Sequence, residues 1–118
     1  MKFEAIDTSS VCAPIGHLFV AAQENCDDDI QFLFECFEKD DFSYPSDEKV
    51  EVNSVEVLSA ITLIKKDLFN AKKESELIHG IEHIMSAAAL PHNPSSSGNS
   101  FLIRCKESVF YINWYRES

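Results

Sequence analysis

Residues 101–115 have the sequence FLIRCKESVFYINWY, and this stretch decides the fold class. Side chains alternate between an apolar set and a mixed set over 101–106 and again over 109–115, a period of two that is typical of β-strands. The two strands meet near Glu107 and Ser108, so the stretch predicts a C-terminal β-hairpin. One face of the hairpin is apolar and is expected to pack against helices. The other face is a second candidate interaction surface, and it carries Arg104, Tyr111, Asn113 and Tyr115.

Upstream of the hairpin, the sequence favours helices. Apolar residues recur every three to four positions in four segments, a spacing that predicts amphipathic helices. These segments are 14–22, 30–37, 54–68 and 75–90. Short strands are expected over 3–6 and around Val50 and Val52. The predicted fold class is therefore α+β, with about four helices packed on a small antiparallel sheet that includes the C-terminal β-hairpin.

Length and composition predict a single globular domain over residues 1–118. A chain of this size buries roughly two thirds of its unfolded surface, and its hydrophobic content of 45% supplies a core. The segment PHNPSSSGNS, residues 91–100, is expected to be a flexible loop within that domain.

The absence of targeting and membrane-spanning patterns, together with the cysteine spacing, predicts a soluble cytoplasmic protein. No uninterrupted apolar segment follows Lys2 to form a secretory signal, and no apolar run approaches the ~18–20 residues needed to span a bilayer. The cysteines match no zinc-binding spacing and are expected to be reduced, buried thiols. They are Cys12, Cys26, Cys36 and Cys105.

Nearly all of the net charge of −10 lies in residues 24–51, which hold 11 acidic and 2 basic residues. Part of this segment has a local use, because Asp27, Asp28 and Asp29 precede a predicted helix whose N-terminus favours negative charge. The carboxylates from Glu35 onwards lie beyond the first turn. A concentrated anionic surface attracts cationic partners and repels phosphate, so the segment favours a protein-binding role and disfavours nucleic-acid binding.

We therefore expect a small acidic inhibitor of a basic protein, an immunity or antitoxin-type protein that neutralises a nuclease toxin. Nucleases present Lys and Arg to phosphate, so carboxylates can block the active site or mimic nucleic acid. The chain resembles bacterial immunity proteins in general physical character, although no motif assigns it to a family. The expected partner-binding residues are Asp28, Glu35, Glu38, Asp40, Asp41, Tyr44, Asp47 and Glu48.

A second hypothesis is a small metal-dependent hydrolase. His79-Gly80-Ile81-Glu82-His83 has the H-x-x-E-H order of inverted zinc peptidases. On a helix, His79 and His83 would share one face and Glu82 could polarise water. The motif lacks a third ligand, and two surface histidines on an amphipathic helix are the favoured explanation, so no cofactor is expected. A third hypothesis is a structural subunit that assembles through the hairpin edge.

Other catalytic classes find no support in the sequence. The chain has no Gly-x-Ser-x-Gly motif, and no glycine-rich phosphate loop occurs among its 3 glycines. Its cysteines lack basic neighbours that would lower a thiol pKa. The sequence thus favours a binding protein over an enzyme.

Overall fold

Strands stand at both ends of the chain, and the helices lie between them. The computed structural model describes residues 1–11, 13–92, 94 and 96–117. The elements in chain order are β1 (Lys2–Asp7), β2 (Ile15–Glu24), α1 (Asp29–Lys39), β3 (Val50–Val52), α2 (Ser54–Asn70), α3 (Glu76–His79), β4 (Ser86–Leu90), β5 (Asn99–Arg104) and β6 (Ser108–Glu117).

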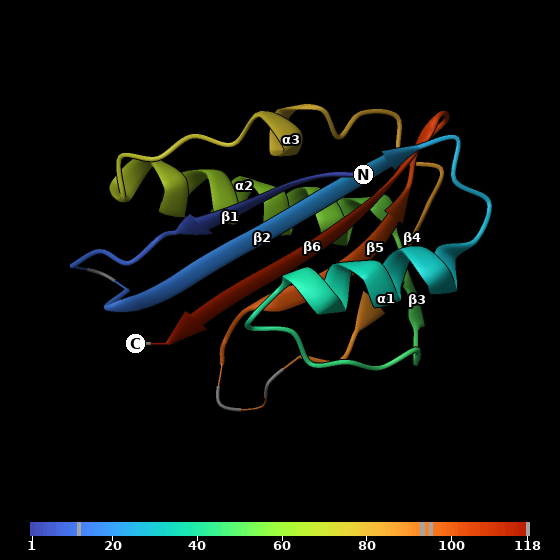
Figure 1. The fold of residues 1–118 in the computed structure, drawn as a ribbon. Coiled ribbons are helices and arrows are strands. Elements are labelled where there is room, and N and C mark those ends of the chain that lie inside the picture. The colour runs from blue at the N-terminus through green and yellow to red at the C-terminus, as the bar shows by residue number, and fades with distance from the viewer. Residues whose placement is uncertain (12, 93, 95, 118) are drawn as a thin grey trace.

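The strands form one antiparallel sheet with the order β1-β2-β6-β5-β4-β3 (Figure 1). The long strands β2 and β6 pair along their whole length, from the Ile15–Glu117 pair to the Glu24–Ser108 pair. The predicted C-terminal hairpin is confirmed as β5 and β6. The short strand predicted around Val50 and Val52 is confirmed as β3, which forms one edge of the sheet.

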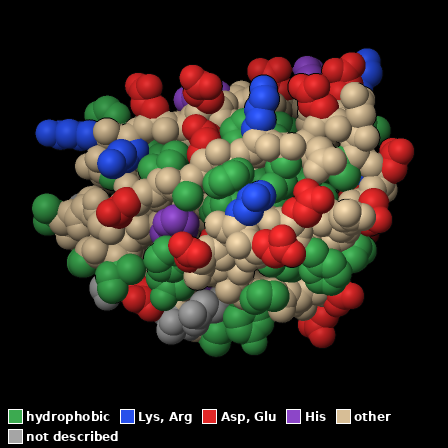
Figure 2. Space-filling model, viewed as in Figure 1, with side chains coloured by type: hydrophobic (Ala, Val, Ile, Leu, Met, Phe, Trp, Pro, Cys, Tyr) green, Lys and Arg blue, Asp and Glu red, His purple; other side chains and the backbone are tan. Residues whose placement is uncertain are grey.

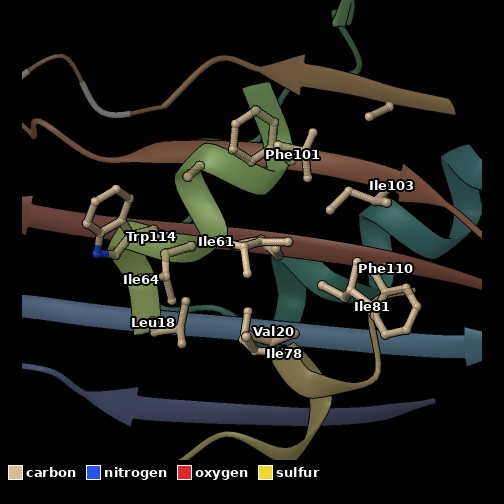
Figure 3. Packing of buried hydrophobic residues seen from close by; sticks show 14 of the residues in the cluster. Leu18, Val20, Ile61, Ile64, Ile78, Ile81, Phe101, Ile103, Phe110 and Trp114 are labelled. Atoms are coloured by element: carbon tan, nitrogen blue, oxygen red, sulfur yellow. The ribbon is translucent and has the colours of Figure 1, made fainter. Parts of the chain in front are cut away.

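Helices cover both faces of this sheet. Figure 1 shows α1 in front of the sheet and α2 behind it, with α3 above α2. Side chains of β2 alternate between the two faces, so Leu18 and Val20 pack with α2 and α3, whereas Phe19 and Ala21 pack with α1. Figure 3 shows the first of these clusters, in which Ile61 of α2 lies over the strands. Two helical layers therefore bury the sheet between them.

The predicted fold class was wrong in its balance of helices and strands. The chain is α+β, but its sheet has six strands, and within the described residues there are only three helices. Only α1 and α2 are longer than a single turn, because α3 has 4 residues. Two of the four predicted helical segments do not form the predicted helix.

The first error concerns residues 14–22, which were predicted to be helical and form most of β2. This strand pairs with β1 on one side and with β6 on the other, and its residues 18–21 are buried on both faces of the sheet. A strand buried on both faces has a continuous apolar run without alternation, so its apolar positions also match a helical spacing.

The second error concerns residues 75–90, of which only Glu76–His79 are helical. Gly80 caps that turn, and the backbone of His83 then has a positive φ of 53°, which a helix does not allow. Met85 donates its N–H to Arg104 at 2.8 Å, and β4 begins one residue later. Alanine favours helices, yet Ala87 and its neighbours pair with β5 and β3, and this long-range pairing overrides local propensity.

The remaining predictions have mixed outcomes. Residues 93 and 95 of the predicted flexible loop 91–100 lie outside the described residues, and Asn99 and Ser100 belong to β5. Cys26, Cys36 and Cys105 are free and buried as predicted, whereas residue 12 lies outside the described part of the chain. No helix within the described residues is long and apolar enough to cross a membrane.

Candidate functional site

Helix α1 is held against the sheet at its N-terminal end. The carboxylate of Asp28 accepts the backbone N–H of Gln31 at 3.1 Å and so caps the helix. The neighbouring Asp29 forms an ion pair with Arg104 of β5, whose guanidinium also donates to the carbonyl of Cys26. These contacts use two members of the acidic segment, Asp28 and Asp29, for structure and leave the outer side of α1 open.

The acidic segment surrounds α1 on one side of the molecule. Figure 2 looks onto this side and shows carboxylate side chains spread over and around α1, with hydrophobic side chains between them. After α1, residues 41–49 run below the helix back towards β3 without forming a helix or strand (Figure 1). We call the acidic face the solvent-accessible carboxylates of Asp27, Asp28, Glu35, Glu38, Asp41, Asp47 and Glu48.

Within this face, the carboxylates nearest the start of α1 are close neighbours. Asp27, Asp28 and Glu35 line one surface hollow of about 280 Å³, together with Gln31 and Phe32. Like charges this close raise the local anionic potential more than isolated carboxylates would. The structure thus brings together the predicted binding residues Asp28 and Glu35, and Glu38 follows on the same helix.

The other end of the face is spread along residues 41–49. Asp41 follows directly after α1, and Tyr44 is 49% exposed in the middle of the segment. Asp47 and Glu48 are exposed at its far end, where Glu48 lines a hollow with Leu90 of β4. The structure therefore places these predicted residues on the same side as α1, but at a separate point from the hollow at the start of the helix.

Apolar side chains on the outer side of α1 were missed by sequence reasoning. Helical spacing over 30–37 places Ile30, Leu33, Phe34 and Phe37 in one apolar stripe, but the buried residues of α1 are Phe32, Leu33 and Cys36. Phe34 is 51% exposed and Ile30 is 38% exposed. The full apolar pattern of α1 has two stripes, and only the sheet decides which of them is covered.

Asp40 is the predicted binding residue that the structure corrects. It is only 3% exposed, and its carboxylate accepts hydrogen bonds from Tyr111 Oη at 3.1 Å and Asn113 Nδ2 at 2.8 Å. It also accepts the backbone N–H of Phe42 at 3.0 Å. Burial and the neighbouring Asp40 raise the pKa of Tyr111, which therefore remains a donor. Asp40 joins the end of α1 to β6 and does not present its charge to a partner.

The same packing of α1 against β6 covers part of the outer face of the hairpin. Tyr111 and Asn113 were part of a candidate interaction surface, but they are 1% and 2% exposed beneath α1 and the start of residues 41–49. Both hairpin strands are also paired on each side, so the hairpin offers no free edge for assembly. Packing of α1 therefore removes Tyr111 and Asn113 from this candidate surface, whereas Arg104 and Tyr115 remain partly exposed.

His17 of β2 extends the buried polar cluster around Asp40. Its ring stacks on Phe42 with a centroid distance of 4.2 Å, and its Nε2 lies 3.9 Å from Oδ1 of Asp40. This Nε2 is buried without a hydrogen-bond partner. Burial lowers the pKa of His17, although Asp40, Asp41 and Asp7 oppose that shift.

This lowered pKa predicts an acid-sensitive contribution of His17 to stability. Above the ordinary value of 6.5, His17 is neutral in both states and the full stability is present. As the pH falls below 6.5, the unfolded chain takes up a proton before the folded chain does, so stability is lost towards the lower folded pKa. Denaturant unfolding at several pH values should therefore show a steeper loss for the native chain than for His17→Gln. His79→Gln, at an exposed position, is the matched control, and parallel curves for all three proteins would contradict the assignment.

The proposed metal motif is not assembled in the fold. His79 ends α3 and His83 lies beyond Gly80 in a non-helical backbone, so the two imidazoles do not share a helical face. No group of three metal-ligating side chains occurs in the described ranges. The premise of one continuous helix over 75–90 was wrong, and the motif loses its geometry with it.

Comparisons with known proteins assign no role to these residues. Searches against protein-family models, curated proteins and solved structures find no match.

Proposed function

We propose that the chain is a small cytoplasmic binding protein that inhibits a basic protein partner through the acidic face. The observation that carries this proposal is the gathering of exposed carboxylates over α1 and residues 41–49, with Phe34 and Tyr44 exposed among them. Charge of this kind accelerates encounter with a cationic surface, and exposed aromatic side chains supply contact area once the surfaces meet.

Anchoring of α1 at both ends supports this role. Arg104 holds the start of the helix through Asp29, and the contacts of Asp40 with Tyr111 and Asn113 hold its end. A rigid helix loses little conformational freedom on binding, so less of the interaction energy is spent on ordering the carboxylates. The carboxylates that α1 carries, Glu35 and Glu38, are thereby preorganised.

The partner class that fits this face best is a nuclease toxin, and the protein is then a bacterial immunity or antitoxin-type protein without catalytic activity of its own. A nuclease concentrates Lys and Arg where it binds phosphate. Carboxylates on a rigid helix can occupy such a site and exclude the nucleic acid. The acidic face would therefore inhibit by covering the phosphate-binding residues.

Neutralising four exposed carboxylates tests this proposal. The variant Glu38→Gln, Asp41→Asn, Asp47→Asn, Glu48→Gln is expected to associate about 10-fold or more slowly with a basic nuclease partner at low salt, since steering depends on these charges. Its association rate should also depend less on salt. Asp40 is left intact because its carboxylate is buried. A pull-down with this chain as bait at low salt identifies the basic partner. Stopped-flow association with that partner provides the measurement, with inhibition of nucleic-acid cleavage as a second readout.

A matched control removes the same number of charges elsewhere. Glu56, Glu74, Glu82 and Glu107 are exposed outside the acidic face. Their replacement by glutamine lowers the net charge equally and should leave the rate within about twofold, because steering acts over roughly one Debye length. Equal slowing in both variants, or no slowing in either, would show that the acidic face does not direct binding.

A further inference from the structure

The outer side of α2 is an apolar surface that the fold leaves uncovered. A surface helix normally presents polar side chains to solvent. On α2, however, Phe69 is 81% exposed, Val55 is 68% exposed, and Leu58 is 50% exposed. Successive residues turn by 100°, so these three lie within one stripe opposite the buried residues Val57 and Ile64. Half or more of each of these three side chains therefore stays accessible to solvent.

Positive charge surrounds this stripe. Lys65 and Lys66 flank it on α2, and Lys72 and Lys73 follow the end of the helix. These four exposed lysines are a large share of the 10 basic residues in the chain. Asp67 of α2 is buried and accepts a hydrogen bond from Trp114 Nε1 at 2.9 Å, so it does not neutralise the surface. The exposed Glu74 lines one hollow with Phe69, Lys72 and Lys73, and positive charge still predominates there. We call this stripe with its lysines the basic face.

The basic face complements the outer side of α1 in apolar content and in charge. Ile30 and Phe34 are exposed on α1, and Glu35 and Glu38 accompany them on its solvent side. An α1 of 11 residues is roughly 16 Å long and an α2 of 17 residues roughly 25 Å, so the shorter helix can lie wholly along the longer one. Apolar side chains can then meet along the centre while lysines meet carboxylates at the rim.

The two complementary surfaces cannot meet within one molecule. Figure 1 shows α1 and α2 on opposite sides of the sheet. We propose that the basic face of one copy binds the α1 face of a second copy, head to tail. Such a contact is heterologous, so the pair as a whole keeps one free basic face and one free α1 face, and association continues to a ring or a chain. The net charge of −10 opposes this contact at long range, and association is therefore expected only at high protein concentration.

Sedimentation of the purified chain from about 1 µM to about 1 mM tests this inference. The mean mass should rise with protein concentration, because every pair still carries one free face of each kind. Lys65→Glu with Lys66→Glu removes the basic face, and Phe34→Ser with Glu38→Lys removes the α1 face. Each variant should remain monomeric when it is alone. Lys2→Glu with Lys106→Glu is the matched charge control, because both lysines are exposed outside the basic face. This variant has the same net charge as the Lys65 and Lys66 variant, but its mean mass should still rise with protein concentration.

An equimolar mixture of the Lys65 and Lys66 variant with the Phe34 and Glu38 variant tests the head-to-tail geometry. Each retains one intact face, so an equimolar mixture should form a one-to-one dimer and nothing larger. A monomeric native chain at every concentration would overturn the inference. Loss of association in the lysine variant but not in the α1 variant would also overturn it, because that result indicates pairing of α2 with α2. No partner protein is present in this experiment, so its outcome is independent of the function proposed above.

Discussion

Replacing Asp40 by alanine is expected to lower the free energy of unfolding by about 3–5 kcal/mol, because a buried donor that loses its acceptor costs about 1–3 kcal/mol and this change affects several. Tyr111 Oη, Asn113 Nδ2 and the backbone N–H of Phe42 all donate to this carboxylate. Asn113 also accepts Ser100 Oγ at 3.0 Å, so the loss extends to β5. Urea unfolding followed by circular dichroism provides the measurement.

The neighbouring Asp41 is the matched control for this prediction. It is exposed, and its replacement by alanine should change the free energy of unfolding by no more than about 0.5 kcal/mol. Asp40→Asn keeps one acceptor oxygen and should fall between the two alanine variants. Equal stability of Asp40→Ala and Asp41→Ala would mean that the buried cluster does not hold the end of α1. In binding experiments, only the Asp41 variant reports on charge at the acidic face.

Replacing Gly98 by alanine is expected to be similarly damaging, at about 3–5 kcal/mol. A Cβ atom at Gly98 would lie 1.4 Å from the carbonyl oxygen of Trp114 and 2.5 Å from its carbonyl carbon. Trp114 cannot move away easily, because it pairs with Leu18 of β2 and Asn99 of β5 in the interior of the sheet. The same clash would separate the first residues of β5 from β6.

Gly80→Ala is the control, since a Cβ there meets its nearest atom at 3.4 Å and the backbone φ is −79°. Its unfolding free energy should change by less than about 1 kcal/mol. The Gly98 variant should give less soluble protein and unfold at lower denaturant concentration than the Gly80 variant. Equal midpoints for the two variants would show that β6 yields to the added methyl group.

Local signals in the sequence were sufficient for part of the fold. The alternation over 101–106 and 109–115 correctly predicted β5 and β6, because a hairpin depends on contacts between neighbouring segments. The helical spacing over 54–68 likewise identified α2, whose cap at Asn53 accepts the N–H of Glu56 at 2.9 Å. Both elements carry their own start and stop signals.

The predicted site was incomplete for a different reason. Sequence reasoning placed the negative charge correctly in one segment, but it treated Asp40 as equivalent to its exposed neighbour Asp41. Only the pairing of β6 with β2 and β5 brings Tyr111 and Asn113 beneath the end of α1. Exposure of Phe34 likewise follows from which stripe of α1 the sheet covers. Neither fact has a signal within the segment itself.

By itself, the sequence determined the charge of residues 24–51, the α1 and α2 helices and the C-terminal hairpin, because each depends on composition or on neighbours along the chain. Tertiary structure decided that residues 15–24 and 86–90 are strands and that Asp40 is buried. In these cases, hydrogen bonds and packing from segments distant along the chain outweigh a local preference of less than about 1 kcal/mol per residue. The side of the molecule on which each charge lies is consequently a property of the assembled sheet.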